Sequence, residues 1–364
     1  MLYYLLYPLR DLWFGFNVFK YITFRAILAS ITSFLICITF GPLVIKKLRE
    51  LKVGEVALRT DAPAIDSHYK HKEGTPTMGG ILIIFAIASS VFLWADIFNK
   101  YIIISFISLF WLGAIGCMDD YVKLTVRRKK RGLSARTKFI GQVLLGILIG
   151  VYLFYFDPHF PKEIEIPFFK DTIMNLGIFY ILFVMLIIVG SSNAVNLTDG
   201  LDGLAIGCVV IMTLAYGIMS YIAGNIKFSG YLNVFYVPAA GELAIVCTAI
   251  LGGGLGFLWF NSYPATVFMG DTGSLSIGGL IGLVAVLIKK ELLLVIAGGI
   301  FVFEALSVII QVVGYKLTKK RIFKMSPFHH HLQLSGWSES KITIRMWIIA
   351  IILVLVSLST LKLR

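Results

Sequence analysis

The feature that most constrains this chain is a series of ten stretches, each 17 to 24 residues long, that are almost continuously apolar. A helix of about 20 apolar residues is long enough to cross the hydrocarbon core of a bilayer. The strands of a membrane β-barrel would instead alternate apolar and polar residues. We therefore predict an all-α polytopic membrane protein with about ten transmembrane helices. The predicted spans cover residues 22–45, 77–95, 101–118, 138–156, 173–192, 203–223, 239–260, 272–288, 292–315 and 345–361.

The composition supports this fold class. Of the 364 residues, 58% are hydrophobic and 15% are charged, whereas a soluble domain has about 45–50% apolar and about 25% charged residues. A single soluble core could not bury so much apolar surface, which excludes a soluble enzyme, a secreted scaffold and a disordered chain. We expect one integral membrane domain over residues 1–364. Residues 1–21 should form an interfacial helix, because Pro8, Arg10 and Asp11 interrupt their apolar run.

The basic residues predict the orientation in the membrane. Ten spans place both termini on one side, and the loops then form two sets. One set contains three strongly basic loops, 46–76, 119–137 and 316–345; with Lys138 at the border of the second, they hold 22 of the 33 Lys and Arg residues. The positive-inside rule makes this set cytoplasmic and both termini periplasmic. Loops 193–202 and 261–271 belong to the same set, whereas Lys289 and Lys290 are exceptions on the opposite side.

The other polar residues gather on these same predicted cytoplasmic loops. Asp119 and Asp120 follow the third span, the 193–202 loop follows the fifth, Asp271 precedes the eighth, and His329–His331 follow the ninth. Chance would scatter such residues over both faces of the membrane. The sequence therefore predicts one chemically active face, on the cytoplasmic side.

The 193–202 loop carries side-chain oxygens at every third position, in Asn193, Asn196, Asp199 and Asp202. Each step of three drifts by about 60° around a helix, so neighbouring pairs face each other but all four do not share a face. Gly200 indicates a break that lets the loop turn its oxygens inward. Oxygen ligands without His or Cys suit Mg²⁺. The alternative is a polar turn that caps the next span, which needs only one such residue.

The remaining clusters each have a functional and a structural interpretation. The Asp119–Asp120 pair is either a cation site or general base, or a solvated helix end. Asp271 is either a member of the same site or the N-cap of the eighth span. The three histidines cannot all point one way from a helix or strand, so they do not form a metal site alone. They could contact phosphate or sugar hydroxyls, as could Lys72.

Two other functions are excluded or disfavoured. The basic run Arg127–Arg131 contains no stacking aromatic residue, which argues against nucleic acid as a partner. No P-loop motif is present, so P-loop ATP hydrolysis is excluded. Acids, Mg²⁺ and cations at the depth of lipid headgroups favour phosphoryl transfer between a soluble nucleotide and a lipid phosphate.

Five motifs, taken together, resemble a known family. They are Lys-x-Gly-Thr-Pro-Thr-Met-Gly-Gly at 72–80, Asp-Asp-Tyr-x-Lys at 119–123, Asn-x-x-Asn-x-x-Asp-Gly-x-Asp-Gly at 193–203, Phe-Met-Gly-Asp at 268–271 and the triple His at 329–331. In this order the chain resembles the polyprenyl-phosphate N-acetylhexosamine-1-phosphate transferases, of the glycosyltransferase family 4 type, over nearly its whole length. In its triple His, the chain resembles the branch of this family that transfers phospho-N-acetylmuramoyl-pentapeptide.

The resemblance implies a reaction and a location. UDP-N-acetylmuramoyl-pentapeptide would donate to undecaprenyl phosphate, giving lipid I and UMP, with Mg²⁺ as cofactor. The enzyme would act in the bilayer of the bacterial cytoplasmic membrane, during peptidoglycan synthesis, and pair as a homodimer. Two alternatives stay open: a sibling transferase that uses UDP-N-acetylglucosamine, and a transporter of a phosphorylated solute. The transporter is disfavoured because the acids lie at span ends and no repeat is visible.

The resemblance also implies residue roles. Asp119 would be the base or orienter for the lipid phosphate, Asp120 its support, and Asp271 a Mg²⁺ ligand or nucleophile. Asn196 and Asp199 would join Asp271 at the metal. The implied substrate-binding residues are Lys72, Lys123, Lys138, Asn193, Asn196, Asp199, Gly200, Asp202, Asn261, Phe268, His329, His330 and His331. Within that set Phe268 would stack on uracil. The family usually has Glu two places after the last His, where this chain has Gln333.

Overall fold

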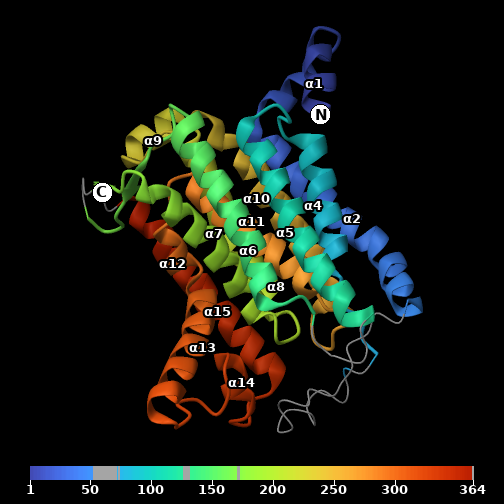
Figure 1. Cartoon of the computed structure of the whole chain (residues 1–364). Coiled ribbons are helices and arrows are strands. Elements are labelled where there is room, and N and C mark those ends of the chain that lie inside the picture. The colour runs from blue at the N-terminus through green and yellow to red at the C-terminus, as the bar shows by residue number, and fades with distance from the viewer. Residues whose placement is uncertain (52–71, 73, 126–131, 170–172, 363–364) are drawn as a thin grey trace.

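The structure is a computed structural model that describes residues 1–51, 72, 74–125, 132–169 and 173–362. The described part of the chain is a helical bundle (Figure 1), which confirms the predicted fold class of an all-α polytopic membrane protein. Nine described helices are long and apolar enough to cross a membrane. They are built on α2 (Ile22–Glu50), α5 (Lys100–Thr125), α6 (Ala135–Val151), α7 (Phe179–Thr198), α8 (Leu204–Ala223), α10 (Leu243–Asn261), α11 (Gly270–Leu287), α13 (Gly299–Thr318) and α15 (Glu339–Ser359). The basic run at 127–131 lies outside the described residues.

The one remaining predicted span, at 77–95, is a shorter helix, α4 (Gly80–Trp94), of 15 residues. At 1.5 Å per residue it is about 22 Å long, less than the span expected over 77–95. The cause lies in the residues before it. Met78 has φ of 68°, which ends any helix there, and the backbone N–H groups of Gly79 and Gly80 donate to the carbonyls of Phe268 and Met269. The 76–80 segment thus pairs with a distant loop.

The prediction for 173–192 is wrong at both ends. Ile173–Asn175 form strand β2, which pairs antiparallel with β1 (Glu163–Glu165), with Ile164 opposite Met174. Helix α7 begins only at Phe179 and continues to Thr198. Residues 193–198 of the expected 193–202 loop are therefore helical, which fixes the directions in which its first polar side chains point.

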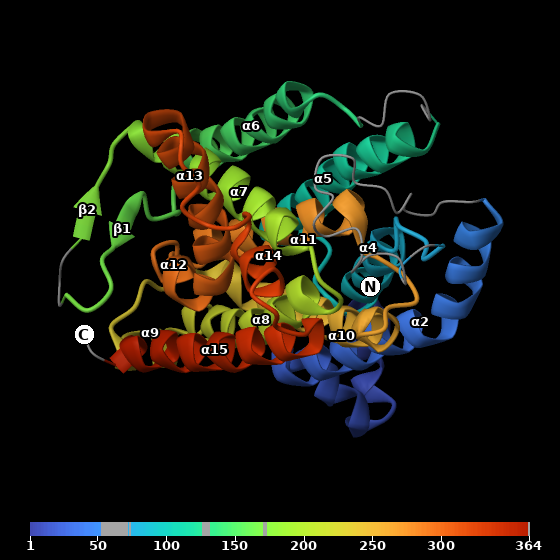
Figure 2. The same ribbon diagram turned by 90° about the horizontal axis from the view of Figure 1, so that it is seen from below.

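The predicted span at 292–315 is also divided. A five-residue helix, α12 (Leu293–Ala297), ends at Gly298, and α13 follows it. The buried residues of α13 all lie between Ile300 and Ser307, so its second half extends away from the bundle. The short α14 (Phe328–Gln333) packs against α13 (Figure 2), and both lie in the lower part of Figure 1.

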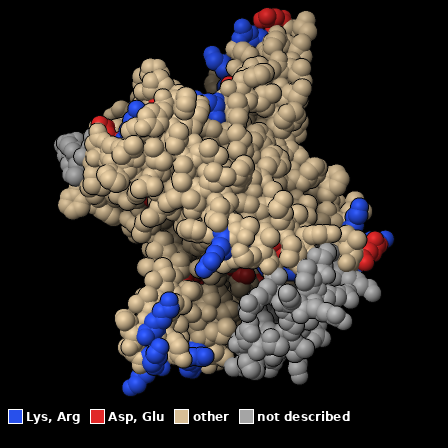
Figure 3. All heavy atoms as spheres, in the orientation of Figure 1, with Lys and Arg blue, Asp and Glu red and all other residues tan. Residues whose placement is uncertain are grey.

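The remaining short elements flank the bundle. Residues 1–21, expected as one interfacial helix, form three short pieces: α1 (Leu2–Leu6), η1 (Tyr7–Asp11) and η2 (Phe14–Lys20). The other pieces are η4 (Tyr152–Phe156), α9 (Ile226–Leu232), η5 (Pro238–Glu242) and η6 (Thr360–Lys362). Figure 3 shows an apolar belt around the middle of the visible surface, with charged side chains toward its upper and lower ends. Such a belt is what a bilayer requires.

Helix α11 is the centre of the bundle, and all of its residues from Thr272 to Leu287 are buried. Glycines allow its neighbours to approach closely, as small residues do in membrane helix pairs. A Cβ atom on Gly278 would lie 2.7 Å from the Ser191 carbonyl oxygen of α7. A Cβ atom on Gly116 of α5 would lie 2.3 Å from the Asp271 carbonyl oxygen. The position of α11 is thus fixed by backbone-to-backbone contact on two sides.

The two exceptional lysines of the topology prediction are buried in ion pairs. Lys289 Nζ lies 2.8 Å from Glu291 Oε1 and 2.7 Å from the Tyr180 hydroxyl. Lys290 pairs with Glu165 of strand β1. Burial lowers the pKa of Lys289, against the opposing effect of Glu291. Their charges are thus compensated locally, which a buried lysine requires.

The close contact between α10 and α2 gives a stability prediction. A Cβ atom on Gly252 would lie 1.9 Å from the Ser30 carbonyl oxygen, so Gly252→Ala should destabilise the bundle by about 1–3 kcal/mol through overpacking. Thermal unfolding in detergent should show a lower melting temperature. The control is Gly190→Ala, whose Cβ would meet nothing within 4 Å. Equal melting temperatures for the two variants would contradict the tight α2–α10 contact.

Candidate active site

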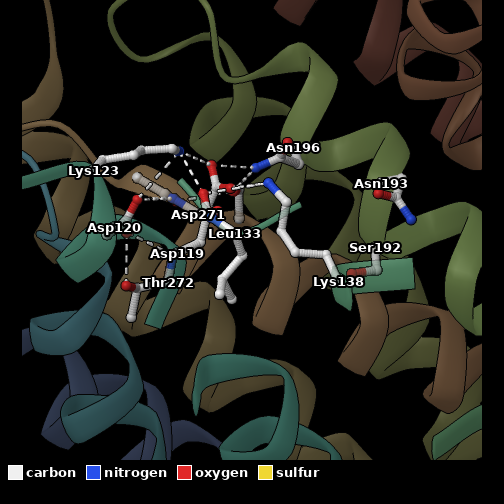
Figure 4. Close-up of polar contacts among 12 residues, drawn as sticks. Asp119, Asp120, Lys123, Leu133, Lys138, Ser192, Asn193, Asn196, Asp271 and Thr272 are labelled. Carbon is white, nitrogen blue, oxygen red and sulfur yellow. Dashed lines mark hydrogen bonds and ion pairs between the residues drawn. The ribbon is translucent and has the colours of Figure 1, made fainter. Parts of the chain in front are cut away.

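Three carboxylates from two helices meet at one end of the bundle. Asp119 and Asp120 lie in the last turns of α5, and Asp271 lies in the first turn of α11. Their ligand oxygens all lie within 4.8 Å of one another. Asp119 and Asp120 are buried, and Asp271 is partly so. Figure 4 shows the three side chains converging, which brings Asp271 to Asp120, 151 positions away in the sequence.

Asp120 holds the start of α11. Its Oδ2 accepts hydrogen bonds from the Thr272 backbone N–H at 3.0 Å and the Thr272 hydroxyl at 2.8 Å, and its Oδ1 accepts from the Asp271 N–H at 3.2 Å. A carboxylate is stabilised by the free N–H groups at a helix N-terminus. Asp120, which belongs to α5, therefore caps the N-terminus of α11. This is the role that the structural interpretation of the sequence assigned to Asp271. The Asp271 carboxylate is left for other contacts.

Two lysines compensate the carboxylates. Lys123 Nζ lies 2.7 Å from Asp119 Oδ2 and 3.2 Å from Asp271 Oδ1. Lys138, at the start of α6, lies 2.9 Å from Asp271 Oδ2 and 3.3 Å from Asp119 Oδ2. With all five groups ionised, three negative and two positive charges leave one net negative charge. Such a cluster can attract a cation and also offers ammonium groups to phosphate.

The two asparagines of α7 serve different partners. Asn196 Nδ2 donates to Asp271 Oδ1 at 3.0 Å and to the Ser274 hydroxyl at 2.8 Å. Asn193 Nδ2 instead donates to Gln142 Oε1 of α6 at 2.7 Å, and Figure 4 shows it beyond Lys138, away from the carboxylates. The helical drift of three positions accounts for this difference. Asp199, predicted as a metal ligand, is not one of the three clustered carboxylates.

A second charged cluster joins three distant segments. Lys72 Nζ lies 2.6 Å from both Asp202 Oδ1 and Glu339 Oε1. Glu339 Oε1 also accepts from the Asp202 backbone N–H at 2.7 Å, and Asp202 Oδ2 accepts from the Ala265 N–H at 2.9 Å. Burial opposes the charge on Lys72, but Glu339 and Asp202 outweigh it and raise its pKa. Lys72 and Asp202 thus stabilise each other, whereas their predicted donor contacts stay predictions.

Glu339 was not among the predicted site residues. It stands alone among Ser338, Ser340 and Lys341 at the beginning of the last span, and no local pattern marks it. Only the fold, which brings the beginning of α15 beside Lys72, gives it a partner.

The predicted uracil-binding residues lie beside this second cluster. The Phe268 ring centroid is 5.7 Å from Lys72 Nζ, a distance at which a cation is attracted to a ring face. Asn261 is buried and bonded at both ends, because its Oδ1 accepts from the Gly203 N–H and its Nδ2 donates to the Val267 carbonyl. Asn261 therefore fixes the backbone of two loops. Contact of either residue with uracil stays a prediction.

The three histidines lie on α14 and point to three different partners, as their consecutive positions require. His329 Nδ1 lies 3.1 Å from Glu304 Oε2, and His330 Nδ1 lies 2.8 Å from Gln333 Oε1. His331 Nδ1 accepts from the Lys324 backbone N–H at 3.1 Å. His329 and His330 are buried, and His331 is partly exposed. Gln333, the residue that departs from the family pattern, thus keeps a hydrogen-bonding role.

The donor set of the three carboxylates suits a hard cation. Carboxylate oxygens are the ligands that Mg²⁺ and Ca²⁺ take in proteins. Among the described residues, Asp119, Asp120 and Asp271 form the one group of three or more potential metal ligands that lie this near to one another. No His or Cys is part of it, which disfavours zinc. These three residues fit a metal ion.

Comparison with known proteins identifies the family. The family model described as Glycosyl transferase family 4 matches residues 101–289, which is more than half of the chain. A shorter model, described as Phospho-N-acetylmuramoyl-pentapeptide-transferase signature 1, matches residues 72–84. The chain belongs to glycosyl transferase family 4. The resemblance that the five motifs indicated is therefore confirmed.

The relatives are similar over their full length. A phospho-N-acetylmuramoyl-pentapeptide-transferase of Citrifermentans bemidjiense is 56% identical over 364 residues, covering 100% of both chains. Proteins of the same name from Geobacter sp. and Desulforapulum autotrophicum are 56% and 52% identical, again over 100% of each chain. The region matched by the family 4 model contains all three clustered carboxylates and both lysines paired with them. The histidines of α14 lie outside it.

The Lys72–Asp202–Glu339 cluster gives the next prediction. Removing one partner of a buried ion pair costs about 3–5 kcal/mol, because the remaining charge is left uncompensated. Glu339→Ala should therefore lower the thermal stability in detergent more than Glu339→Gln, which keeps a hydrogen-bond acceptor. Because the pKa of Lys72 is raised, the stabilisation should be complete from neutral pH up to the pKa of free lysine. It should be lost as the pH rises further, through the higher pKa of Lys72 in the folded protein. Equal stability of wild type and both variants would contradict the cluster.

Proposed function

We propose that the chain transfers phospho-N-acetylmuramoyl-pentapeptide from UDP-N-acetylmuramoyl-pentapeptide to undecaprenyl phosphate, giving lipid I and UMP. The observation that carries this proposal is the cluster of Asp119, Asp120 and Asp271 with Lys123 and Lys138 at the end of a membrane bundle. Membership of family 4 and the names of the full-length relatives support it. An acidic, lysine-lined site at headgroup depth suits a lipid phosphate and a nucleotide diphosphate together.

In this reaction a lipid phosphate oxygen forms a bond to the β-phosphorus of the UDP-sugar. The bond from that phosphorus to the bridging oxygen breaks, and UMP leaves with both bonding electrons. Lys123 and Lys138 would neutralise the phosphate oxygens, while Asp119 would orient the attacking lipid phosphate. The same residues also allow a two-step route, in which the Asp271 carboxylate attacks first and the lipid phosphate then displaces it.

We assign the cofactor as Mg²⁺, held by Asp271 together with Asp119 and Asp120. When bound, Mg²⁺ stabilises the charge that develops on the transferring and leaving phosphate oxygens. Asn196 would support the metal through its hydrogen bond to Asp271. The role proposed for Asp199 is outside this group, at the donor rather than the metal.

We place the protein in the bacterial cytoplasmic membrane with the carboxylates on the cytoplasmic face and both termini in the periplasm. The distribution of Lys and Arg supports this orientation. The described ends agree with it, because α1 and the end of α15 lie in the upper part of Figure 1, away from α14 in the lower part. Pairing of two copies as a homodimer stays a prediction.

The decisive assay is UMP release. Purified protein with UDP-N-acetylmuramoyl-pentapeptide, undecaprenyl phosphate and Mg²⁺ should release UMP, and EDTA should stop the release until Mg²⁺ is restored. UDP-N-acetylglucosamine in place of the pentapeptide donor should give at most about 1% of that rate. Equal or faster release from UDP-N-acetylglucosamine would favour the sibling transferase. No UMP above background, together with substrate uptake into liposomes, would favour a transporter.

Asp271 is predicted to be essential. Asp271→Ala should lower the rate of UMP release by at least about 10³-fold, because it removes the group that contacts both lysines and the proposed metal. The matched control is Asp11→Ala, which removes an acid whose side chain is 88% exposed on the N-terminal segment. Release within about threefold of wild type by Asp271→Ala would refute the assigned role.

A further inference from the structure

A buried acid in α13 lies outside both charged clusters. Glu304 lies inside a membrane-spanning helix and is 0% exposed. No Lys or Arg pairs with it in the part of the chain that the structure describes, where its one ion-pair partner is His329. A carboxylate in such a place is costly, and an apolar side chain would fill the space at lower cost. Its presence therefore calls for a role.

The Glu304 carboxylate holds His329 by two groups. The His329 backbone N–H donates to Oε1 at 3.2 Å and to Oε2 at 3.3 Å, and the ring Nδ1 lies 3.1 Å from Oε2. An ionised carboxylate only accepts hydrogen bonds, so with Glu304 ionised the proton of the ring lies on Nδ1. The ring plane and the tautomer are therefore both set by Glu304.

The opposite edge of the ring lies against Gly200. A Cβ atom built on Gly200 would lie 2.2 Å from His329 Nε2 and 2.9 Å from Cε1, so only glycine allows this approach. Nε2 is buried, and no hydrogen-bond partner for it is found among the described residues. A histidine that binds substrate phosphate would expose this nitrogen. Its burial against the loop backbone instead indicates a contact that places the loop.

Gly200 lies between the two charged clusters. Four residues before it, Asn196 donates to Asp271. Two residues after it, Asp202 pairs with Lys72 beside Phe268. The position of Gly200 thus sets the distance between the carboxylates and the proposed nucleotide pocket.

We propose that Glu304 and His329 are positioning residues: the pair on α13 and α14 presses the imidazole edge against Gly200 and thereby sets the donor pocket. This proposal rests on the proposed transferase function. It replaces, for His329, the predicted role of neutralising a phosphate. His330 and His331 keep that prediction.

A double-mutant cycle tests the contact. Gly200→Ala should push the loop from the ring, raising the KM for the UDP donor at least about tenfold while kcat and the KM for undecaprenyl phosphate stay within about threefold. In Gly200→Ala/His329→Ala the clash is gone, so the double variant should be no worse than His329→Ala alone. The control is Gly190→Ala on α7, the helix that precedes the Gly200 turn, where a Cβ meets open space. Two results would overturn the proposal: a double variant in which the KM increases of the two single variants multiply, or a Gly200→Ala variant whose donor KM equals that of wild type.

Variants of Glu304 provide a second test, which remains valid if Gly200→Ala fails to fold. Glu304→Gln keeps an acceptor for Nδ1–H and should raise the donor KM by at most about threefold, whereas Glu304→Leu should raise it about tenfold or more. Equal KM values for the two variants would show that the acceptor has no positioning role.

A spectroscopic readout separates this proposal from the transferase function. In protein labelled with ¹⁵N-histidine, the His329 signal, identified by its loss in His329→Ala, should show a protonated Nδ1 that changes in Glu304→Leu. If wild-type protein released no UMP but showed this signal, the transferase function would fail while the Glu304–His329 pair stood. An unprotonated Nδ1 in active wild-type protein would overturn the pair alone.

Discussion

Charged groups at the ends of membrane-spanning helices are stable only when hydrogen-bond donors or opposite charges surround them. Asp119, Asp120 and Asp202 each meet this condition with at least one partner from another segment. Asp120 is bonded by the first N–H groups of α11, Asp119 by Lys123 and Lys138, and Asp202 by Lys72. No single helix could supply these partners. The arrangement of the helices and the composition of the site are therefore set by the same requirement.

Close helix packing makes these pairings geometrically feasible. Asp120 reaches the N-terminus of α11 because Gly116 lets α5 approach the Asp271 carbonyl at backbone distance. A larger residue at Gly116 would separate the two helices and with them Asp119, Asp120 and Asp271. The glycines of this bundle thus contribute to the chemistry indirectly, by keeping the carboxylates within reach of one another and of the lysines.

The sequence predicted the fold class well, because long apolar stretches in a bilayer leave few alternatives. It was less accurate where tertiary contacts override local pattern. The 77–80 segment pairs with the carbonyls of Phe268 and Met269, so α4 begins late, and Ile173–Asn175 pair with β1, so α7 does too. Such pairings involve residues distant in sequence, and hydropathy carries no information on them.

The site shows the same division. Motif positions led to Asp119, Asp120 and Asp271, and the structure clusters them. Asn196 faces Asp271, whereas Asn193 faces Gln142. The three-residue spacing did not predict this difference, because the end of α7 was expected to be a loop. Glu339 and Glu304 were not among the predicted site residues. Their partners, Lys72 and His329, are 267 and 25 positions away.

The central claim is that this cluster of acids and lysines moves a phosphoryl-sugar group onto a lipid phosphate. Donor labelled with ³²P in its β-phosphate tests that claim most directly. After incubation with undecaprenyl phosphate and Mg²⁺, the label should enter the organic-extractable lipid, and the released UMP should be unlabelled. Label that stayed in the aqueous fraction, or a lipid product that formed without it, would contradict the account.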